Sequence, residues 1–170
     1  PGATDLGGME CPDLFHIIAD DGTSHWVLGA SMDGWGAGSL GTYAYWIGNW
    51  DGTRFVTDNL RPQWLDHGYD WYAAVTWSSA DSPQNVRHAV AWMNNWKYAA
   101  RHVPTLDTDG YNCQYSVVRE IRLCRQPGGW YSLLSAPEPV LATSLLSQKS
   151  LGDVNVNGRR VLDVTTEAYV

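Results

Sequence analysis

Short runs of aromatic and β-branched residues, separated by turn residues, recur along this chain. One run covers residues 25–31 and follows Asp21-Gly22, and another covers residues 42–48 and leads into Asp51-Gly52, after which residues 53–56 return. Because aspartate and glycine accept the backbone angles of tight turns, Asp-Gly between two such runs predicts an antiparallel hairpin. We therefore expect the first half of the chain to consist of antiparallel strands.

The same pattern continues through the second half. Further strand candidates cover residues 71–77, 87–93, 115–123 and 130–134, and no long segment keeps the 3.6-residue apolar period of a helix. Strands that recur about every 8–12 residues are typical of a sandwich, a barrel or a propeller. If the fold is a propeller, residues 25–90 supply the four strands of one blade in meander order.

The pattern changes near residue 135. Residues 135–139 are rich in proline, residues 140–149 predict a short helical or irregular linker, and residues 160–170 predict one more strand. A chain that stops on an unpaired strand exposes a sheet edge that attracts other chains. We therefore expect this sequence to be an interior piece of a larger protein.

Charge and composition exclude several classes of partner. The 170 residues contain 11 Lys and Arg against 18 Asp and Glu, a net charge of −7, which disfavours nucleic acid or an anionic membrane as partner. No apolar run approaches the ~20 residues that span a bilayer. Ten Trp and nine Tyr against two Phe favour surfaces that stay partly wet, because these rings carry a polar edge.

The cysteines and histidines predict neither a disulfide framework nor a cofactor. Cys11, Cys113 and Cys124 form an odd, sparse set, and we expect free, mostly buried thiols. The five histidines lack the spacing of a zinc site, so no metal or other cofactor is expected.

Four motifs stand in order at residues 9–15, 64–77, 91–98 and 116–123, and they resemble, in the same order, those of the glycoside hydrolase family 32 fructosidases. Residues 9–15 resemble the Glu-Cys-Pro motif, and residues 64–77 resemble an aspartate-aromatic-tyrosine-alanine-alanine strand. Residues 91–98 resemble a Trp-Met-Asn-Trp block, and residues 116–123 resemble the Arg-Glu strand that closes the catalytic domain. The resemblance implies an all-β fold, namely the later blades of a five-bladed β-propeller, a linker and the first strand of a C-terminal β-sandwich.

The resemblance also implies a division of the chain and a missing part. Residues 1–125 correspond to a partial propeller domain, 126–154 to the linker and 155–170 to the start of the sandwich. The family carries its nucleophile in a Trp-Met-Asn-Asp-Pro-Asn-Gly motif and its transition-state stabiliser in an Arg-Asp-Pro motif, and neither occurs here. The implied partner is therefore an N-terminal fragment of the same protein, and residues 1–170 alone are expected to be inactive.

The resemblance assigns site residues. Retaining hydrolysis needs two carboxyl groups about 5–5.5 Å apart, and the motif makes Glu10 the general acid/base. Tyr72 and Trp96 match sugar-contacting residues of the family, and Asp70 lies two positions from Tyr72, so one strand would point both to one face. The remaining substrate-binding candidates are Cys11, Trp92 and Trp35. We expect Cys11 to pack beside Glu10 and hold it in place, and Trp35 lies in a glycine-rich loop.

The implied function is that of a secreted, extracellular enzyme acting on a fructan such as levan or inulin, or on sucrose, without a cofactor. A fructosyltransferase of the same family is an alternative. From a different class, a non-catalytic carbohydrate-binding fragment would use Tyr72, Trp96 and Trp35 as a sugar platform and would not need the second carboxylate.

Overall fold

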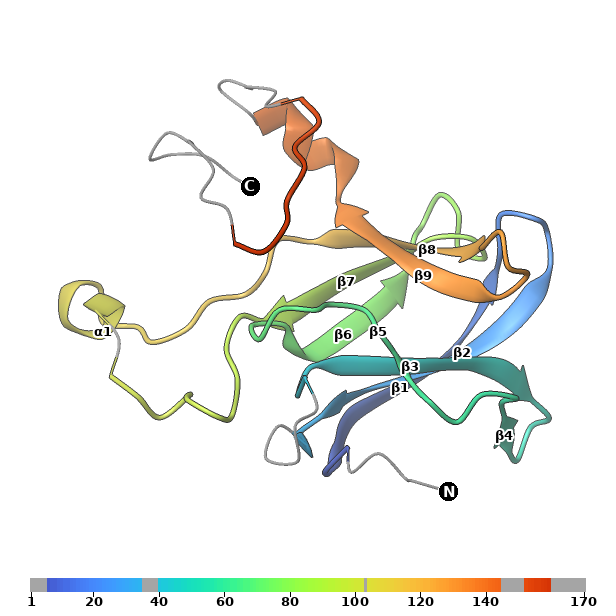
Figure 1. The fold of residues 1–170 in the computed structure, drawn as a ribbon, viewed down its shortest axis with the longest axis horizontal. Helices are drawn as coiled ribbons and strands as arrows, with labels where there is room; N and C mark the ends of the chain where they lie inside the picture. The colour runs from blue at the N-terminus through green and yellow to red at the C-terminus, as the bar shows by residue number, and fades with distance from the viewer. Residues whose placement is uncertain (1–5, 35–39, 103, 145–151, 160–170) are drawn as a thin grey trace.

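The protein is an all-β chain with antiparallel sheets (Figure 1). The structure is a computed structural model that describes residues 6–34, 40–102, 104–144 and 152–159. Helices within these ranges are short, as expected: α1 (Pro104–Thr108) and a 3-10 helix (Pro139–Ser144). None of the helices in the described residues is long and apolar enough to cross a bilayer.

The first sheet contains the N-terminal strands in the order β1-β2-β3-β4, and β5 pairs with β3. Both predicted Asp-Gly turns are present, because Gly22 and Gly52 have φ of 83° and 100° and the preceding aspartates accept hydrogen bonds from the chain that follows. The strands are β1 (Met9–Ile18), β2 (Ser24–Met32), β3 (Tyr43–Trp50), β4 (Phe55–Val56) and β5 (Gln63–Trp64).

The second sheet has the order β6-β7-β8-β9. Its strands are β6 (Tyr72–Ser78), β7 (Arg87–Trp92), β8 (Arg119–Arg125) and β9 (Tyr131–Pro137). The prediction that residues 25–90 form one four-stranded blade is therefore wrong, since this run is divided between the two sheets. Residues 9–18 form a further strand, which pairs with β2. The first sheet therefore begins one strand earlier in the sequence than predicted.

The second sheet extends beyond residue 125, where the linker was expected to begin. β8 and β9 pair from Arg119 opposite Pro137 to Arg125 opposite Tyr131, so residues 126–130 are a hairpin turn within the sheet. The expected helical linker corresponds in part to the 3-10 helix. The expected last strand, residues 160–170, lies outside the described residues.

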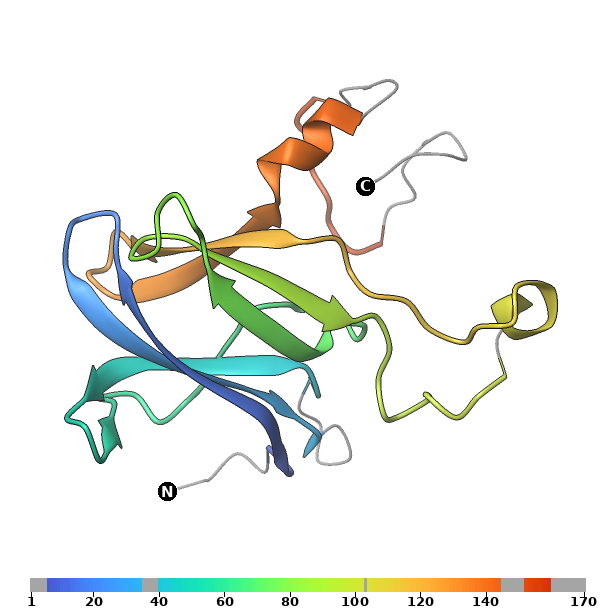
Figure 2. The ribbon, with the colours of Figure 1, turned by 180° about the vertical axis from the view of Figure 1, so that it is seen from behind.

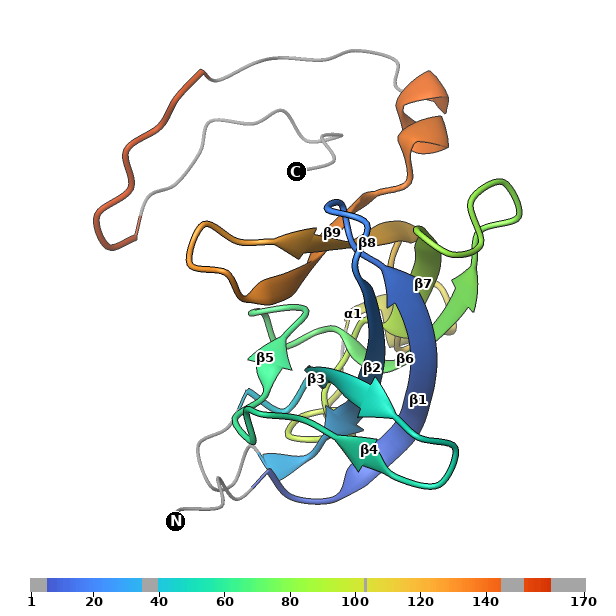
Figure 3. The same cartoon turned by 90° about the vertical axis from the view of Figure 1, so that its right-hand side faces the viewer.

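One hydrophobic core joins the two sheets, which lie one above the other with β9 over β3 (Figures 1 and 3). Seen from behind, the segment that carries α1 extends away from both sheets (Figure 2). Gly29 is required within β2, because a Cβ there would lie 1.9 Å from the hydroxyl oxygen of the buried Tyr43. The other core side chains include Phe15, Ile17, Val27, Tyr45, Trp71, Ile121 and Leu123.

The cysteines differ from expectation in burial. All three are free, but Cys11 and Cys113 are exposed and Cys124 is half-buried. Cys11 lies at the irregular start of β1 and Cys113 in the loop before β8, where no second layer covers them.

Candidate active site

Glu10 and Tyr72 occupy equivalent irregular positions in the two sheets. The register of β1 against β2 shifts between Glu10 and Asp13, and Cys11 has φ of 48°. The register of β6 against β7 shifts in the same way after Tyr72, and Ala73 has φ of 50°. A bulge re-aims the side chains beside it, and a left-handed non-glycine residue persists only where the surrounding structure holds it.

The carboxylate of Glu10 accepts two hydrogen bonds at one oxygen. The hydroxyl of Tyr72 donates to Glu10 Oε2, and the indole Nε1 of Trp96 donates to the same oxygen at 3.1 Å. Glu10 is exposed, whereas Tyr72 is 2% exposed. Two donors on Oε2 fix the orientation of the carboxylate, and no described residue donates to Oε1. The two bonds thus hold the Glu10 carboxylate in one orientation.

Tyr72 remains a hydrogen-bond donor across the ordinary pH range. Burial raises the pKa of its phenol well above the usual value, and the hydrogen bond to Glu10 and the negative charges of Glu10 and Asp33 raise it further. The phenol therefore keeps its proton, so its interaction with the Glu10 carboxylate persists at neutral pH.

Three aromatic rings form a cluster beside Glu10. The Trp92 and Trp96 ring centroids are 5.2 Å apart, and each ring lies edge-on to Tyr72, at 6.2 Å and 6.4 Å. These separations are within the range of favourable edge-to-face pairs. Trp96 is 57% exposed, so the cluster presents an apolar ring to solvent next to a carboxylate. This combination suits a sugar, which offers both hydroxyl groups and an apolar C–H face.

Asn95 positions Trp96 and was missed by the sequence reasoning. It is 1% exposed, and its Nδ2 donates to the carbonyl oxygens of Gly41 at 2.8 Å and Tyr69 at 3.1 Å. Its Oδ1 accepts from the Lys97 N–H at 3.0 Å. These bonds tie the loop after β7 to the segments that precede β3 and β6. The sequence signal was that Asn95 lies within the Trp-Met-Asn-Trp block of residues 91–98, which gave it no role of its own.

Asp33 is a second residue that the sequence reasoning missed. It follows β2, accepts a hydrogen bond from the Gly8 N–H, and lies near enough to Tyr72 to raise the pKa of that phenol. In the sequence, Asp33-Gly34 indicates only a turn and gives no sign that Asp33 lies near Tyr72.

The remaining predicted binding residues are Asp70, Cys11 and Trp35. Asp70 is exposed, precedes β6 and accepts a hydrogen bond from the Tyr98 hydroxyl, so the shared-face reasoning, which needs both residues inside one strand, does not apply to it. The exposed Cys11 adjoins Glu10 and contributes the backbone turn of the bulge. Trp35 lies outside the described residues.

A polar network ties β1 to β6 behind the site. Asp13 accepts a hydrogen bond from the Thr76 hydroxyl and lies 3.8 Å from Nη2 of Arg87. The buried Arg87 donates from Nε to Thr76 Oγ1 at 2.9 Å and lies over the Phe15 ring, 4.1 Å from its centroid. This network fixes the strand that carries Glu10 to the strand that carries Tyr72.

Metal-ligating side chains do not cluster in the described part of the chain. No three or more His, Cys, Asp or Glu side chains there could jointly hold an ion. The described side chains that contact or adjoin Glu10 are two neutral hydrogen-bond donors and a cluster of aromatic rings.

Comparison with known proteins places the chain in a family. Residues 2–137 match the family described as glycosyl hydrolases family 32, N-terminal domain. Levanbiose-producing levanases of Geobacillus stearothermophilus and Bacillus subtilis (strain 168) are each 46% identical over 165 residues, 96% of this chain. The chain spans 41% and 31% of the lengths of these two relatives.

A solved structure gives the same result for the fold. The exo-inulinase of Aspergillus awamori superposes with a TM-score of 0.68 at 25% identity, and the superposition covers 84% of this chain and 28% of the exo-inulinase.

Proposed function

The chain belongs to glycosyl hydrolase family 32, and from this premise we propose that it is part of a retaining β-fructosidase in which Glu10 is the general acid/base. The observation that carries the proposal is the pair of donors, Tyr72 and Trp96, that converge on Glu10 Oε2 beside an exposed aromatic ring. A carboxyl group held in one orientation next to a sugar-binding surface is what proton transfer to a glycosidic oxygen requires.

The proposed reaction runs in two displacements. In the first, a carboxylate outside these 170 residues attacks the anomeric carbon of the fructosyl unit, while Glu10 gives its proton to the departing oxygen. In the second, Glu10 takes a proton from water, whose oxygen attacks the same carbon and releases the enzyme carboxylate. Glu10 thus returns to its protonated form and no cofactor is consumed.

The proposed partner is the N-terminal part of the same protein. The sequence contains neither the Trp-Met-Asn-Asp-Pro-Asn-Gly motif nor the Arg-Asp-Pro motif, and the chain spans less than half of each levanase that it matches. Within the complete enzyme, Tyr72, Trp92 and Trp96 would contact the fructosyl unit, and residues 1–170 alone would be inactive.

The proposed substrates are levan, inulin and sucrose. Levan is favoured by the names of the relatives at 46% identity. Because a polymeric fructan does not cross a membrane, an enzyme that degrades it acts outside the cell, so we propose an extracellular location.

The alternative of a non-catalytic carbohydrate-binding protein is favoured by one observation. Trp96 is 57% exposed and packs edge-to-face against Trp92, which is sufficient for a sugar platform without chemistry. The decisive difference between the two functions is whether turnover depends on the Glu10 carboxyl group.

The test is Glu10→Gln in the polypeptide that carries both carboxylates. We expect kcat on levan and sucrose to fall by about 10²–10⁴-fold with a small change in substrate affinity. The matched control is Glu120→Gln, since Glu120 lies in β8 and pairs with Arg122 at 2.5 Å. A binding protein would be indifferent to Glu10→Gln, and equal turnover in the two variants would refute the proposal.

Chemical rescue adds a second readout. In Glu10→Ala, azide can attack the fructosyl-enzyme without a general base, because it is already an anion. With an aryl β-fructofuranoside, whose leaving group departs without protonation, we expect azide to restore turnover and the product to be a β-fructosyl azide. Failure of azide to accelerate this variant would contradict the assigned role.

A further inference from the structure

A cleft of about 520 Å³ lies between the first sheet and the β8–β9 hairpin. It is bounded by the end of β3, by the segment 57–63 and by residues 129–131. Binding sites for small molecules occupy about 300–1,000 Å³, so the cleft is large enough for a ligand.

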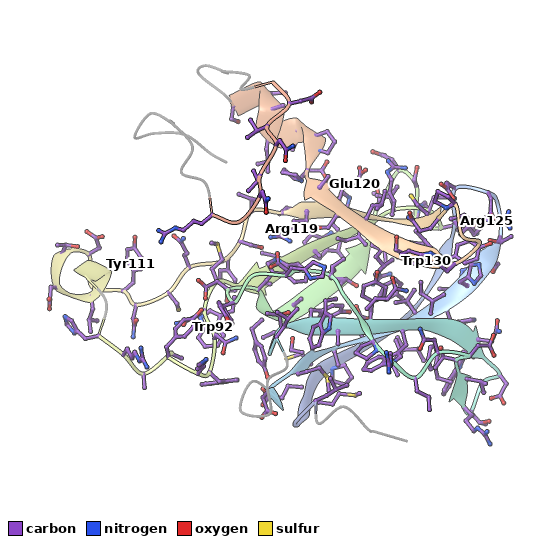
Figure 4. All side chains as sticks on the ribbon, viewed as in Figure 1. Trp92, Tyr111, Arg119, Glu120, Arg125 and Trp130 are labelled. Carbon is purple, nitrogen blue, oxygen red and sulfur yellow. The ribbon has the colours of Figure 1, made fainter. Side chains whose placement is uncertain are left out.

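The cleft extends away from Glu10 along β3. Glu10 pairs with Ser31 and Ser31 with Tyr43, whereas β3 lines the cleft from Tyr45 to Asn49, toward the other end of the strand. At about 3.3 Å per residue, Tyr43 and Asn49 are roughly 20 Å apart along the strand. In Figure 4, Trp92 of the candidate active site and Trp130 of the cleft lie at opposite ends of the second sheet.

Aromatic rings form much of the cleft wall. Trp130 is 55% exposed, and its indole N–H has no acceptor among the described residues. Opposite it, the Trp46 Nε1 donates to the carbonyl of Leu60 at 3.0 Å, and His25 packs on Tyr131 with ring centroids 4.1 Å apart. One ring is therefore free to stack on a ligand, while the others are held in place.

The polar side chains of the cleft are also available. Those of Asn49, Asp58 and Arg61 are exposed and make no hydrogen bond or ion pair within the described part of the chain. Asp58 and Arg61 carry opposite charges, so the cleft has little preference for an ionic ligand. Unpaired polar groups around an exposed indole suit a neutral ligand with many hydroxyl groups.

We propose that this cleft is a second saccharide-binding site, which holds a segment of a neutral fructan chain away from the catalytic carboxyl group. The identity of the saccharide rests on the proposed function. A polymer bound at the cleft keeps its other segments at a high local concentration near Glu10, whereas a disaccharide is too short to reach both sites. The cleft would thus favour polymeric over small substrates.

The experiment compares Trp130→Ala with Trp77→Ala in the polypeptide that carries both carboxylates. Trp77 is also exposed, at 41%, but lies in β6 outside the cleft. Levan and inulin binding is measured by isothermal titration calorimetry in a Glu10→Gln background. We expect Trp130→Ala to weaken polymer binding by about tenfold, because truncating a stacked aromatic typically costs that much, and Trp77→Ala to have no effect.

A kinetic readout uses the enzyme with Glu10 intact. The ratio of kcat/KM for levan to kcat/KM for sucrose should fall about tenfold in Trp130→Ala and stay constant in Trp77→Ala. Asn49→Ala is the second cleft variant, because this exposed side chain makes no hydrogen bond or ion pair with any residue that the structure describes, and it should change both readouts in the same direction.

Equal polymer binding by Trp130→Ala and Trp77→Ala, or an equal loss on levan and sucrose, would overturn the inference. This outcome differs from a failure of the proposed function. If Trp130→Ala weakens fructan binding but the wild-type enzyme hydrolyses no fructoside, saccharide binding at the cleft is supported and the fructosidase assignment is refuted. If the wild-type enzyme hydrolyses fructosides but neither cleft variant has an effect, the fructosidase assignment is supported and saccharide binding at the cleft is refuted.

Discussion

The hydroxyl of Tyr72 donates a hydrogen bond to the carboxylate of Glu10 across 62 positions of sequence. This bond joins the beginnings of β1 and β6, at the same end of the two sheets, immediately before the bulge in each strand. The candidate site therefore depends on the packing of one sheet against the other, and a change in that packing would separate the acid/base from its donors.

Tyr72→Phe should reduce catalysis without unfolding the protein. The variant keeps the buried ring and its edge contacts with Trp92 and Trp96 but removes the donor to Glu10. A hydrogen bond to a charged group contributes about 1.5–3 kcal/mol, so kcat/KM should fall by about ten- to a hundredfold. Steady-state kinetics on sucrose tests this, and an unchanged kcat/KM in a folded Tyr72→Phe protein would show that the bond has no catalytic role.

Trp96→Phe and Trp96→Ala should separate the two functions of the indole. Phenylalanine keeps an apolar ring but removes the 3.1 Å hydrogen bond to Glu10, whereas alanine removes both. We expect Trp96→Phe to lower mainly kcat and Trp96→Ala also to raise KM, because the exposed ring contacts the sugar in both ground and transition states. Identical kcat and KM values in the two variants would contradict this division.

Arg87→Lys should destabilise the fold by about 2 kcal/mol, because lysine cannot reproduce the several bonds of the guanidinium group. Arg87 is buried and bonds to Thr76 through both Nε and Nη2, at 2.9 and 2.7 Å, and to Ser78 through Nη1 at 3.1 Å. The matched control is Arg122→Lys, whose side chain is 53% exposed and which should change stability by less than about 0.5 kcal/mol. Urea unfolding of both variants measures the difference, and equal midpoints would exclude a structural role for the network.

Stability should depend on Asp21 in a defined acidic range. The hydroxyl and the N–H of Thr23 lower the pKa of Asp21 from 3.8 to about 2, assisted by Tyr131 and Arg125. A carboxyl group whose pKa is lower in the folded state stabilises the fold above its unfolded pKa, and this contribution disappears as the pH falls from about 4 to about 2. Asp21→Asn should therefore lower the urea midpoint at pH 7, and the difference from wild type should shrink over that range.

Asp51→Asn is the control for the contact of Asp21 with the second sheet, since hydrogen bonds from Thr53 also lower the pKa of Asp51. Asp51 caps the β3–β4 turn through equivalent bonds to Thr53, but its hydrogen bonds are confined to that turn. Asp21 also accepts a hydrogen bond at 2.9 Å from the hydroxyl of Tyr131, which belongs to the second sheet. A larger loss of stability from Asp51→Asn than from Asp21→Asn would show that the contact between sheets is unimportant.

The local sequence patterns correctly predicted antiparallel strands, because strands and turns are encoded by neighbouring residues. Alternating aromatic and β-branched residues predicted β2, β3, β6 and β7, and Asp21-Gly22 and Asp51-Gly52 predicted their turns. The same patterns did not reveal which strands share a sheet. That depends on β1 pairing with β2 and on β9 pairing with β8, and residues 9–18 lack a clean alternation because of the bulge after Glu10.

The amino-acid order was sufficient for the family, the all-β class and the identity of Glu10, Tyr72 and Trp96 as candidates, because these features reside in contiguous motifs. Only the three-dimensional arrangement placed Tyr72 and Trp96 on one oxygen of Glu10, paired Asp70 with Tyr98, and added Asn95 as a support. The cleft at Trp130 likewise joins residues from both sheets. Such contacts arise from packing between segments distant in sequence, and local backbone preferences do not contain that information.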